Sequence, residues 1–488
     1  MGLITAVNIL IILSLISKAI THSSPMCDNC TCLVHDDKFI FDCSHSPYLV
    51  VNELYQDANF VDISSDNQTL YDIYYLNMTG LPIENVHTIL PNSSVKVLDL
   101  TNTMIMDITN EAFKNLQQMV ELKLSYNLLD GLSPDLFKGL QLDGKDYPLR
   151  SLKILRLDHN RLHTIHNDAF QHIEQTIEEL YLQNNPLKII DLSTLQAIHG
   201  ILNLRVLDLS STDIITLPPD FLHTPGKLEE LYLSNNLITN VTCLGLGMAH
   251  VLKRLTLSGN PIINITEETA FPEVPTLEFL HMCKMPELEV IGDHALCALT
   301  GLKELHMAYN PKLHSISESA LTHVETGSEA PVISYLKKLY LSNNALTRLE
   351  LAMHWSALED LDINGNPWTC EYENQWIVDT LLPVYCKINE KRCKELKCAA
   401  PIEMEQYTFY ELHEKKYKMR RLDQYGNHPE NDGIILVCFM LGLLIGIVVI
   451  LFGVYAWKRH WFGIFDKSPA AYSRQFYGRT TTQDEYIE

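Results

Sequence analysis

One set of side chains capable of chemistry recurs at a regular spacing along this chain of 488 residues. Its members are Tyr181, Glu230, Tyr232, Phe279, His281, Glu304, His306 and Tyr340. Carboxylates beside imidazoles and phenols suit acid–base catalysis, metal binding or the recognition of another protein. Because the set is spread over many repeats of roughly 25 residues instead of forming one cluster, it predicts an extended recognition surface.

Catalysis and metal binding are the competing interpretations of these residues. His281, Cys283, Glu304 and His306 fall on one predicted face, and imidazole with thiolate suits zinc. Their spacing differs from that of strong zinc motifs, so we expect no metal site. The sequence also contains no G-x-S-x-G, H-E-x-x-H or phosphate-loop motif. We therefore expect no catalytic residue, no cofactor and no enzymatic activity.

Short strands built on L-x-L must position these side chains. The first leucine of each strand is Leu98, Leu122, Leu155, Leu180, Leu207, Leu231, Leu255, Leu280, Leu305, Leu339 or Leu361. Alternation along a strand sends both leucines inward and the residue between them outward. Most steps are 24 or 25 residues, the period of leucine-rich repeats, and a weaker match around Leu76 brings the number to about twelve. The predicted fold is an α/β leucine-rich-repeat solenoid with a curved parallel sheet on its concave face.

An asparagine follows most of these strands. The positions are Asn127, Asn160, Asn185, Asn236, Asn260, Asn310, Asn344 and Asn366. A buried amide offers two donors and an acceptor, so it can satisfy backbone groups of its own coil and of the neighbouring coil. Thr79, Thr103, Thr212 and Met285 occupy this position in the other repeats, where we expect a weaker ladder.

The outward positions form two columns on the predicted concave face. The residues inside L-x-L are Asp99, Lys123, Arg156, Tyr181, Asp208, Tyr232, Thr256, His281, His306, Tyr340 and Asp362. The residues before L-x-L are Val97, Glu121, Ile154, Glu179, Val206, Glu230, Arg254, Phe279, Glu304, Lys338 and Asp360. Aromatic side chains surrounded by polar groups are typical of protein-recognition hot spots. The alternative is that tyrosine is simply a common strand residue.

Two repeats are longer than the others, and residues 139–150 and 323–334 carry the excess. Both segments are polar and contain glycine and proline, so they predict surface loops on the return side of the coils. Lengthening a surface loop costs little, so they are either tolerated insertions or loops that bind a partner.

Two apolar runs enclose the part of the chain expected to be exported. Residues 1–19 predict a signal peptide, because their apolar run is too short for a membrane span. Residues 434–457 carry no charge, which is typical of a transmembrane helix, and Lys458 and Arg459 follow it. This order predicts a single-pass type I protein of the plasma membrane with an extracellular N-terminus.

Cysteines cluster at both ends of the repeats. The disulfide candidates are Cys27, Cys30, Cys32, Cys43, Cys370, Cys386, Cys393 and Cys398. Disulfide-rich caps would cover the ends of the solenoid core, and four cysteines in one cap allow three pairings. Cys243, Cys283 and Cys297 lie between the caps, and their odd number requires a free or interchain cysteine. Strand alternation points Cys283 outward, so Cys283 is our candidate, and with it a homodimer.

Sequons and the C-terminal residues supply candidate modification sites. The glycosylation candidates are Asn67, Asn77, Asn92, Asn240 and Asn264, and Asn29 is doubtful because it lies between cap cysteines. Residues 458–488 are too few to bury a core, so we expect a short disordered tail without a Toll-type signalling domain. Tyr486 follows two acidic residues and is a candidate for phosphorylation.

The chain is acidic, with a formal net charge of −23 at pH 7. Nucleic acid is an unsuitable partner for such a surface, because phosphate binding needs a basic stripe. A basic ligand or partner surface would be attracted, although acidic residues also serve solubility alone.

With repeats, cysteine clusters and an apolar span, the chain resembles the extracellular leucine-rich-repeat membrane proteins. This class includes Toll-type ectodomains and adhesion proteins of the Capricious, Tartan and Connectin kind. The resemblance covers residues 27–398, and Asn366-Pro367-Trp368-Thr369-Cys370 resembles the start of the C-terminal cap motif of the class. Tyr372 stands where the class has a second cysteine. The resemblance implies a curved, non-catalytic solenoid that recognises proteins, often on its concave sheet.

These features predict seven segments: a signal peptide (1–19), an N-terminal cap (20–69), the repeats (70–366), a C-terminal cap (367–400), a juxtamembrane stalk (401–433), a transmembrane helix (434–457) and a cytoplasmic tail (458–488). The predicted function is that of an adhesion molecule or co-receptor, which binds an extracellular protein ligand or a surface protein of a neighbouring cell. A Toll-type immune or developmental receptor that signals through a partner is the second hypothesis, and an enzyme is the third.

Overall fold

The computed structural model describes eight stretches of the chain: residues 30–35, 38–45, 73–87, 90, 93–142, 145–322, 336–419 and 430–459. Several predictions fall outside these residues: the signal peptide (1–19), Cys27, Asn29, Asn67, Asn92, the second insertion (323–334) and Tyr486. The chain divides into two units, one with the repeats and caps and one with the apolar helix.

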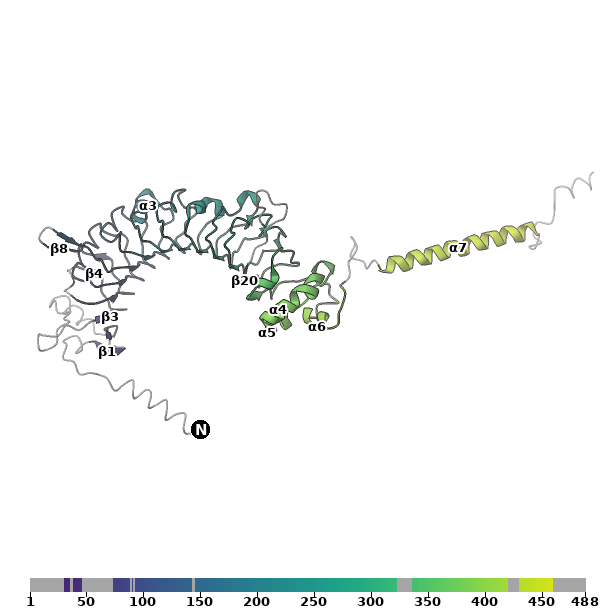
Figure 1. The fold of residues 1–488 in the computed structure, drawn as a ribbon, viewed down its shortest axis with the longest axis horizontal. Helices are drawn as coiled ribbons and strands as arrows, with labels where there is room; N and C mark the ends of the chain where they lie inside the picture. The colour runs from purple at the N-terminus through teal and green to yellow at the C-terminus, as the bar shows by residue number, and fades with distance from the viewer. Residues whose placement is uncertain are drawn as a thin grey trace, which may run out of the picture. The chain divides into compact units, whose positions relative to one another are not determined.

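A sheet of fourteen strands runs through the first unit, and in Figure 1 it lines the inner side of an arc of coils. It begins with an antiparallel hairpin of β1 (Thr31–His35) and β2 (Lys38–Asp42). The parallel strands that follow are β3 (Ile73–Asn77), β5 (Val97–Asp99), β7 (Glu121–Lys123), β10 (Ile154–Arg156), β11 (Glu179–Tyr181), β12 (Val206–Asp208), β13 (Glu230–Tyr232), β14 (Arg254–Thr256), β16 (Phe279–His281), β18 (Glu304–His306), β20 (Lys338–Tyr340) and β21 (Asp360–Asp362). The predicted parallel-sheet solenoid is confirmed.

Equivalent leucines are aligned across the sheet, because every coil repeats the same strand. Leu155 pairs with Leu180, and Leu180 pairs with Leu207, and none of the three has exposed surface. On the return legs Phe113, Phe137 and Phe170 are buried, with ring centroids 6.5 and 6.4 Å apart. The leucines and phenylalanines therefore form one continuous core, and each coil is stabilised mainly by its two neighbours.

The asparagines bridge adjacent coils as expected. Asn236 Nδ2 donates to the carbonyl oxygen of Leu233 in its own coil (3.0 Å) and to that of Leu209 in the preceding coil (2.8 Å). Its Oδ1 accepts from the backbone N–H groups of Thr212 (3.0 Å) and Ile214 (3.1 Å). The Thr212 hydroxyl donates to the Leu209 oxygen (2.7 Å), so threonine keeps the bond within its own coil.

The residue before each asparagine has a left-handed backbone, which turns the chain out of the strand. At Gly259 φ is 74°, and a β-carbon there would lie 2.2 Å from Oδ1 of Asn235. Other side chains occupy this conformation in neighbouring coils, for example Tyr126 (φ 56°) and His159 (φ 55°), whose rings stack 3.8 Å apart. The turn therefore exposes a second row of side chains along one edge of the sheet.

In the described residues, the elements of the return legs are short. The strands are β4 (Asn85–Val86), β6 (Asp107–Ile108), β15 (Asn264–Ile265), β17 (Val290–Ile291) and β19 (Ser315–Ile316). The helices are α3 (Leu192–His199), η2 (Val241–Leu244), η3 (Leu246–Met248), η4 (Glu267–Thr269) and η5 (Trp355–Ala357). The first insertion, which was predicted to be a surface loop, contains an antiparallel hairpin of β8 (Leu140–Leu142) and β9 (Lys145–Tyr147).

The C-terminal cap covers the last leucines with short helices. They are η6 (Tyr372–Asn374), the π-helix η7 (Ile377–Leu381), α4 (Leu382–Ile388), α5 (Glu390–Glu395) and α6 (Phe409–Glu414). Two disulfides, Cys370–Cys398 and Cys386–Cys393, select one of the three pairings that the sequence left open. The buried Trp368 indole donates from Nε1 to the carbonyl oxygen of Ile363 (2.8 Å).

The C-terminal cap extends beyond the predicted boundary at residue 400. Phe409 and Leu412 of α6 are buried, and the His413 ring is hydrogen-bonded through Nδ1 to the carbonyl oxygen of Val378 (2.8 Å). A bridge between Lys397 and Thr408 ties the segment to the cap. The compact unit accordingly runs to Tyr417, so the first part of the predicted stalk is packed structure.

At the N-terminal end, Cys30 and Cys43 form a disulfide, and Cys32 is also disulfide-bonded. The second unit contains α7 (Glu430–Lys458). Within its segment Leu436–Lys458, the most apolar stretch has a mean hydropathy of 3.0 and no buried residue, so the segment is long and apolar enough to cross a membrane.

Candidate binding face

The two outward columns lie on the open face of the sheet, as the strand alternation predicted. All eight candidate residues of this face are partly exposed, whereas the leucines beside them are buried. Four members of the columns are buried: Val97, Asp99, Val206 and Thr256. The face is therefore a surface of mixed exposure, on which rings and charged groups are held by their neighbours.

In the middle of the face, Tyr181 lies between an arginine and a carboxylate. The Arg156 guanidinium lies 4.1 Å from the centre of the Tyr181 ring, and the Tyr181 hydroxyl donates to Glu179 (2.8 Å). Burial and the nearby Glu179 carboxylate raise the pKa of Tyr181 to about 12. Arg156 itself pairs with Glu121 through a contact of 2.7 Å. Two neighbouring strands thus fix this ring rigidly, which lowers the entropy lost on binding.

A related arrangement occurs two strands later, where the arginine covers a different ring. The Tyr232 hydroxyl donates to Glu230, and Arg254 lies 3.6 Å from the Glu230 carboxylate. The Arg254 guanidinium stacks 4.2 Å from the ring centre of Phe279. Burial and the Glu230 carboxylate raise the pKa of Tyr232, so its hydroxyl stays protonated at neutral pH.

Three rings stack in a row on strands β16, β18 and β20. His281 and His306 lie 4.1 Å apart, and His306 and Tyr340 lie 4.3 Å apart. Burial, then the charges of His306 and Arg254, lower the pKa of His281 to about 4. The pKa of His306 is also lowered by burial, against the opposing effect of the neighbouring Glu304. This part of the face is therefore uncharged imidazole and phenol at neutral pH.

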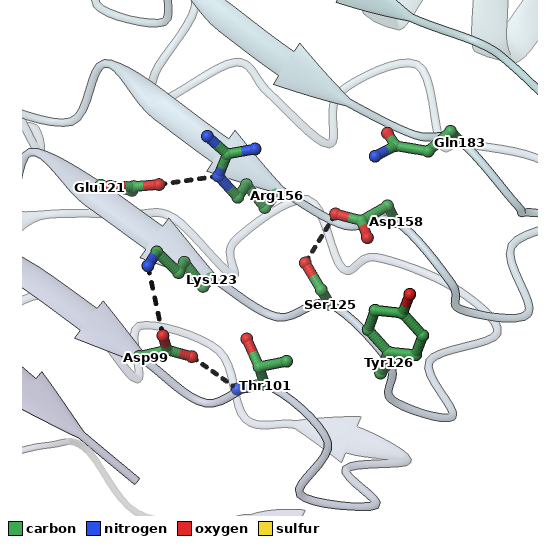
Figure 2. A pocket seen from close by; sticks show the side chains of 9 residues that line it. All are labelled: Asp99, Thr101, Glu121, Lys123, Ser125, Tyr126, Arg156, Asp158 and Gln183. Carbon is green, nitrogen blue, oxygen red and sulfur yellow. Dashed lines mark hydrogen bonds and ion pairs between the residues drawn. The ribbon is translucent and has the colours of Figure 1, made fainter. Parts of the chain in front are cut away.

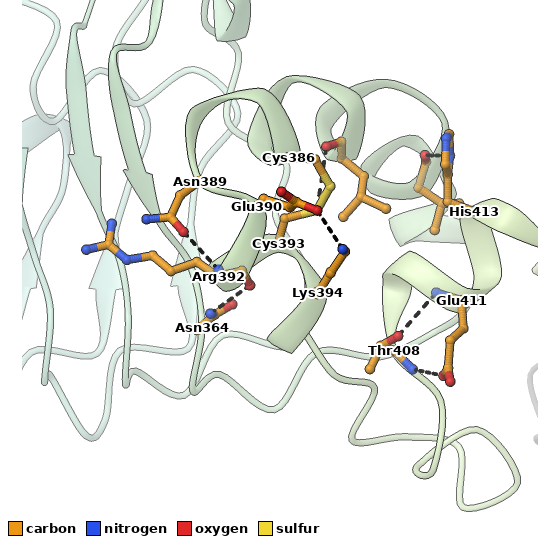
Figure 3. Close-up of a disulfide and its surroundings, with 12 residues drawn as sticks. Asn364, Cys386, Asn389, Glu390, Arg392, Cys393, Lys394, Thr408, Glu411 and His413 are labelled. Atoms are coloured by element: carbon orange, nitrogen blue, oxygen red, sulfur yellow. Dashed lines mark hydrogen bonds and ion pairs between the residues drawn. A yellow bond between two sulfur atoms is a disulfide. The ribbon is translucent and has the colours of Figure 1, made fainter.

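The C-terminal cap contributes to this face, which sequence reasoning did not find. Arg392 of α5, shown in Figure 3, pairs with Asp360 through a contact of 2.9 Å. Asp360 also accepts the hydroxyl proton of Tyr340 (2.6 Å). The Arg392 backbone oxygen accepts from Asn364 Nδ2 (2.9 Å). The cap thus fixes the last aromatic ring of the face through a residue more than thirty positions away along the chain.

A charged hollow lies nearer the N-terminal end of the face, and Figure 2 shows the residues that line it. Its volume is about 480 Å³. The lining residues are Asp99, Thr101, Glu121, Lys123, Ser125, Tyr126, Arg156, Asp158 and Gln183. None of these was among the candidates chosen from the sequence, although several stand in the two columns. Most of their charges are paired, because Lys123 contacts Asp99 (3.3 Å) and Arg156 contacts Glu121 (2.7 Å), while Asp158 accepts from the Ser125 hydroxyl (2.6 Å).

A ladder of alternating charges borders the face. Its residues stand two positions before L-x-L and are Lys153, Glu178, Arg205, Glu229, Lys253, Glu278 and Lys303. Contacts of 2.7 to 3.8 Å join most neighbours in this ladder. Exposed pairs stabilise a fold only slightly. The border is therefore close to neutral.

The structure also shows the surroundings of the proposed metal ligands and of the free cysteines. Within the described stretches, no group of three or more His, Cys, Asp or Glu side chains is arranged to hold a metal ion. Cys283 is partly buried, and burial raises the pKa of its thiol. Cys243 is also free and is exposed on the return side. Geometry therefore favours Cys243 over Cys283 as the more accessible thiol, in contrast to the argument from strand alternation.

The sequons occupy two different surfaces. Asn240 and Asn264 stand at equivalent positions of neighbouring coils on the return flank, and Asn264 is exposed. Asn77 lies on the concave sheet, and its Nδ2 donates to Asp42 (3.0 Å). Glycans on the first two would leave the candidate face open.

Comparison with known proteins agrees with this geometry. Residues 93–143 and 202–262 match the family model described as leucine rich repeat. These repeats therefore have the leucine-rich-repeat solenoid fold. Chaoptin of Drosophila melanogaster is 31% identical to the chain over 196 residues, which is 36% of this chain and 14% of Chaoptin. Podocan-like protein 1 of Mus musculus is 28% identical over 193 residues, 39% of this chain and 32% of that relative. The chain thus spans less than a third of either relative.

Among the solved structures, one example shares the fold of these repeats. It is the octameric complex of Latrophilin 3, Unc5D and FLRT2, in which a chain is 21% identical and superimposes with a TM-score of 0.51. The superposition covers 67% of this chain and 92% of that chain. The relatives agree with the leucine-rich-repeat fold of this chain, and α7 fits a single membrane span.

Proposed function

We propose that this protein is a non-catalytic cell-surface receptor or adhesion molecule that binds a protein through the concave face of strands β11 to β20. The supporting observation is the row of rings and carboxylates from Tyr181 to Tyr340, which is partly exposed and held in place by hydrogen bonds and stacking. Rigid aromatic groups surrounded by polar groups are what binding hot spots share. Helix α7 would anchor the chain, with its repeats outside the cell and Lys458 inside.

The border ladder and the return flank are less suitable for binding a protein, which also supports the proposal. The border ladder is close to neutral, and the return flank carries the sequons at Asn240 and Asn264. A glycan withdraws the surface beneath it from protein contact. The concave face is thus the surface best suited to a protein partner, which is either a soluble ligand or a protein on an adjacent cell.

Mixing of labelled cells tests this function. Cells that display the full-length protein are mixed with each other and with non-expressing cells, and clustering is counted. Clusters of expressing cells alone indicate homophilic adhesion, whereas mixed clusters indicate a different surface partner. If neither forms, labelled media proteins are screened on the same cells for a soluble ligand.

The role of the concave face is tested with a matched pair of variants. Phe279→Ala removes a ring from the face, and Ile263→Ala removes an exposed apolar side chain (50% exposed) from the return flank. We expect F279A to weaken binding about tenfold, since hot-spot rings contribute more than 1 kcal/mol each. I263A should leave binding unchanged. Equal loss from both variants, at equal surface expression, would show that the partner binds elsewhere.

A further inference from the structure

Three strands in the middle of the face bring two phenol rings to either side of one carboxylate. The parallel register sets Tyr181 opposite Asp208 and Asp208 opposite Tyr232. At the usual spacing of strands, the two tyrosines stand roughly 10 Å apart across the sheet. Glu179 and Glu230 lie in the adjoining column of the same strands, and each accepts the hydroxyl proton of its tyrosine. The Tyr181–Asp208–Tyr232 row therefore has three carboxylates around two rings.

Elsewhere on the face, the protein supplies its own cation to an aromatic ring. Lys123 lies 5.2 Å from the ring centre of Tyr75, and Arg254 lies 4.2 Å from that of Phe279. Arg156 covers one side of Tyr181 in the same way. Such contacts are favourable because the face of an aromatic ring is electron-rich.

Tyr232 and Asp208 depart from this pattern, whereas Tyr181 keeps one side of its ring open. Among the described residues, no cation lies over the Tyr232 ring and none forms an ion pair with Asp208. Asp208 accepts from the backbone N–H of Ser210 (2.9 Å) and from the Ser210 side chain, both of which are uncharged. Burial and the repulsion of Asp158 raise the pKa of the Asp208 carboxyl, which is the opposite of what a bound cation would do.

We propose that the Tyr181–Asp208–Tyr232 row docks a lysine or arginine side chain from a basic segment of the protein partner. The inference rests on the proposed function of the concave face and names the chemistry of its partner. A cationic head between the two rings would lie within about 6 Å of both ring centres, the range of a cation–π contact. It would also pair with Asp208 and face the carboxylates of Glu179 and Glu230.

Charge complementarity supports this occupant over others. The chain carries a formal charge of −23, which attracts a basic segment from a distance. A metal ion is an unsuitable occupant, because in the part of the chain that the structure describes no group of three or more His, Cys, Asp or Glu side chains is arranged to hold one. An acidic or purely apolar segment would leave the Asp208 carboxylate without a counter-charge, which is costly at a half-buried position.

The test uses the full-length protein in lipid nanodiscs and a fluorescent peptide of alternating glycine and lysine. The comparison peptide has glutamine in place of lysine. Asp208→Asn removes the charge but keeps the oxygen that accepts from Ser210, and Tyr232→Leu removes the ring. Tyr232→Phe keeps the ring, and Glu268→Gln removes one unit of charge from the exposed return side.

We expect the lysine peptide to bind and the glutamine peptide to bind at least about tenfold more weakly. D208N and Y232L should each weaken lysine-peptide binding about tenfold, whereas Y232F and E268Q should change it by less than about twofold. Equal losses from D208N and E268Q would overturn the proposal, because general attraction by net charge would then explain the binding. Equal binding of the two peptides would overturn it as well.

Failure here is distinguishable from failure of the proposed function. If F279A still weakens attachment of the cellular or soluble partner while D208N and Y232L do not, the concave face binds a partner but the row holds no cation. If F279A leaves attachment unchanged and the peptide results are as expected, the row binds cations but the partner docks elsewhere, which overturns the link between the two.

Discussion

Replacement of Asn236 should reveal how far the asparagine ladder holds the coils together. In Asn236→Ala, the carbonyl oxygen of Leu209 keeps the Thr212 hydroxyl (2.7 Å), and that of Leu233 keeps Nδ2 of Asn260 (2.9 Å). Both carbonyl oxygens therefore keep a hydrogen bond. The backbone N–H groups of Thr212 and Ile214 lose their acceptor inside the core. At about 1–3 kcal/mol for each buried unpaired group, the free energy of unfolding should fall by roughly 2–6 kcal/mol.

Thr212→Val is the matched control for this experiment. It removes one hydroxyl at nearly constant volume, and the Leu209 oxygen still accepts from Nδ2 of Asn236 (2.8 Å). The Oδ1 atom of Asn236 also keeps its two backbone donors. We therefore expect T212V to cost no more than about 1 kcal/mol, the net value of an ordinary hydrogen bond.

Urea unfolding of the full-length protein in nanodiscs measures the free energies, and amide hydrogen exchange locates the effect. Because each coil is stabilised mainly by its neighbours, N236A should reduce protection most in the coils of β12 and β13. Protection in β18 and β20 should change least. Equal costs for N236A and T212V would refute the reasoning, since the unpaired N–H groups would then contribute nothing.

Three further predictions concern the cysteines and a histidine. Replacing Cys370 and Cys398 by serine removes the disulfide that closes the C-terminal cap, and should lower the free energy of unfolding by about 2–5 kcal/mol; unchanged urea midpoints would contradict this. Maleimide should label the exposed Cys243 faster than the partly buried Cys283, whose thiol pKa is raised by burial, and similar rates by mass spectrometry would show that the face opens. His281 has a pKa lowered from 6.5 to about 4, so the unfolded state binds more protons in that interval and stability should fall as pH drops from 6.5 towards 4. H281F should lose less stability over this interval, and equal slopes for both proteins would assign the loss to other groups.

The repeats could be predicted from the sequence because their physics is local. Alternation in L-x-L decides which side chains point inward, and the period decides that equivalent residues lie on neighbouring strands. Leu155, Leu180 and Leu207 are buried and aligned as expected. The candidates from Tyr181 to Tyr340 lie on the open face for the same reason.

The pairing of groups on that face was less predictable. The repeat pattern places Arg156 and Tyr181 on adjacent strands. It does not predict that the Arg156 guanidinium covers the Tyr181 ring or that it pairs with Glu121. Rotamers decide such contacts, and they depend on the neighbours on every side. Strand alternation favoured Cys283 as the accessible cysteine, but Cys243 is more exposed in the structure. Exposure also depends on the neighbours on every side.

The sequence by itself therefore determined the solenoid, its concave face and the helix long enough to cross a membrane, since each follows from a repeat or a composition within one stretch of chain. Only the tertiary structure decided the disulfide pairs Cys370–Cys398 and Cys386–Cys393, and the extension of the cap through α6. It also brought Arg392 of the cap to Asp360 of the last strand. These contacts join residues without periodic spacing, so their distance in space is set by packing and not by any pattern along the chain.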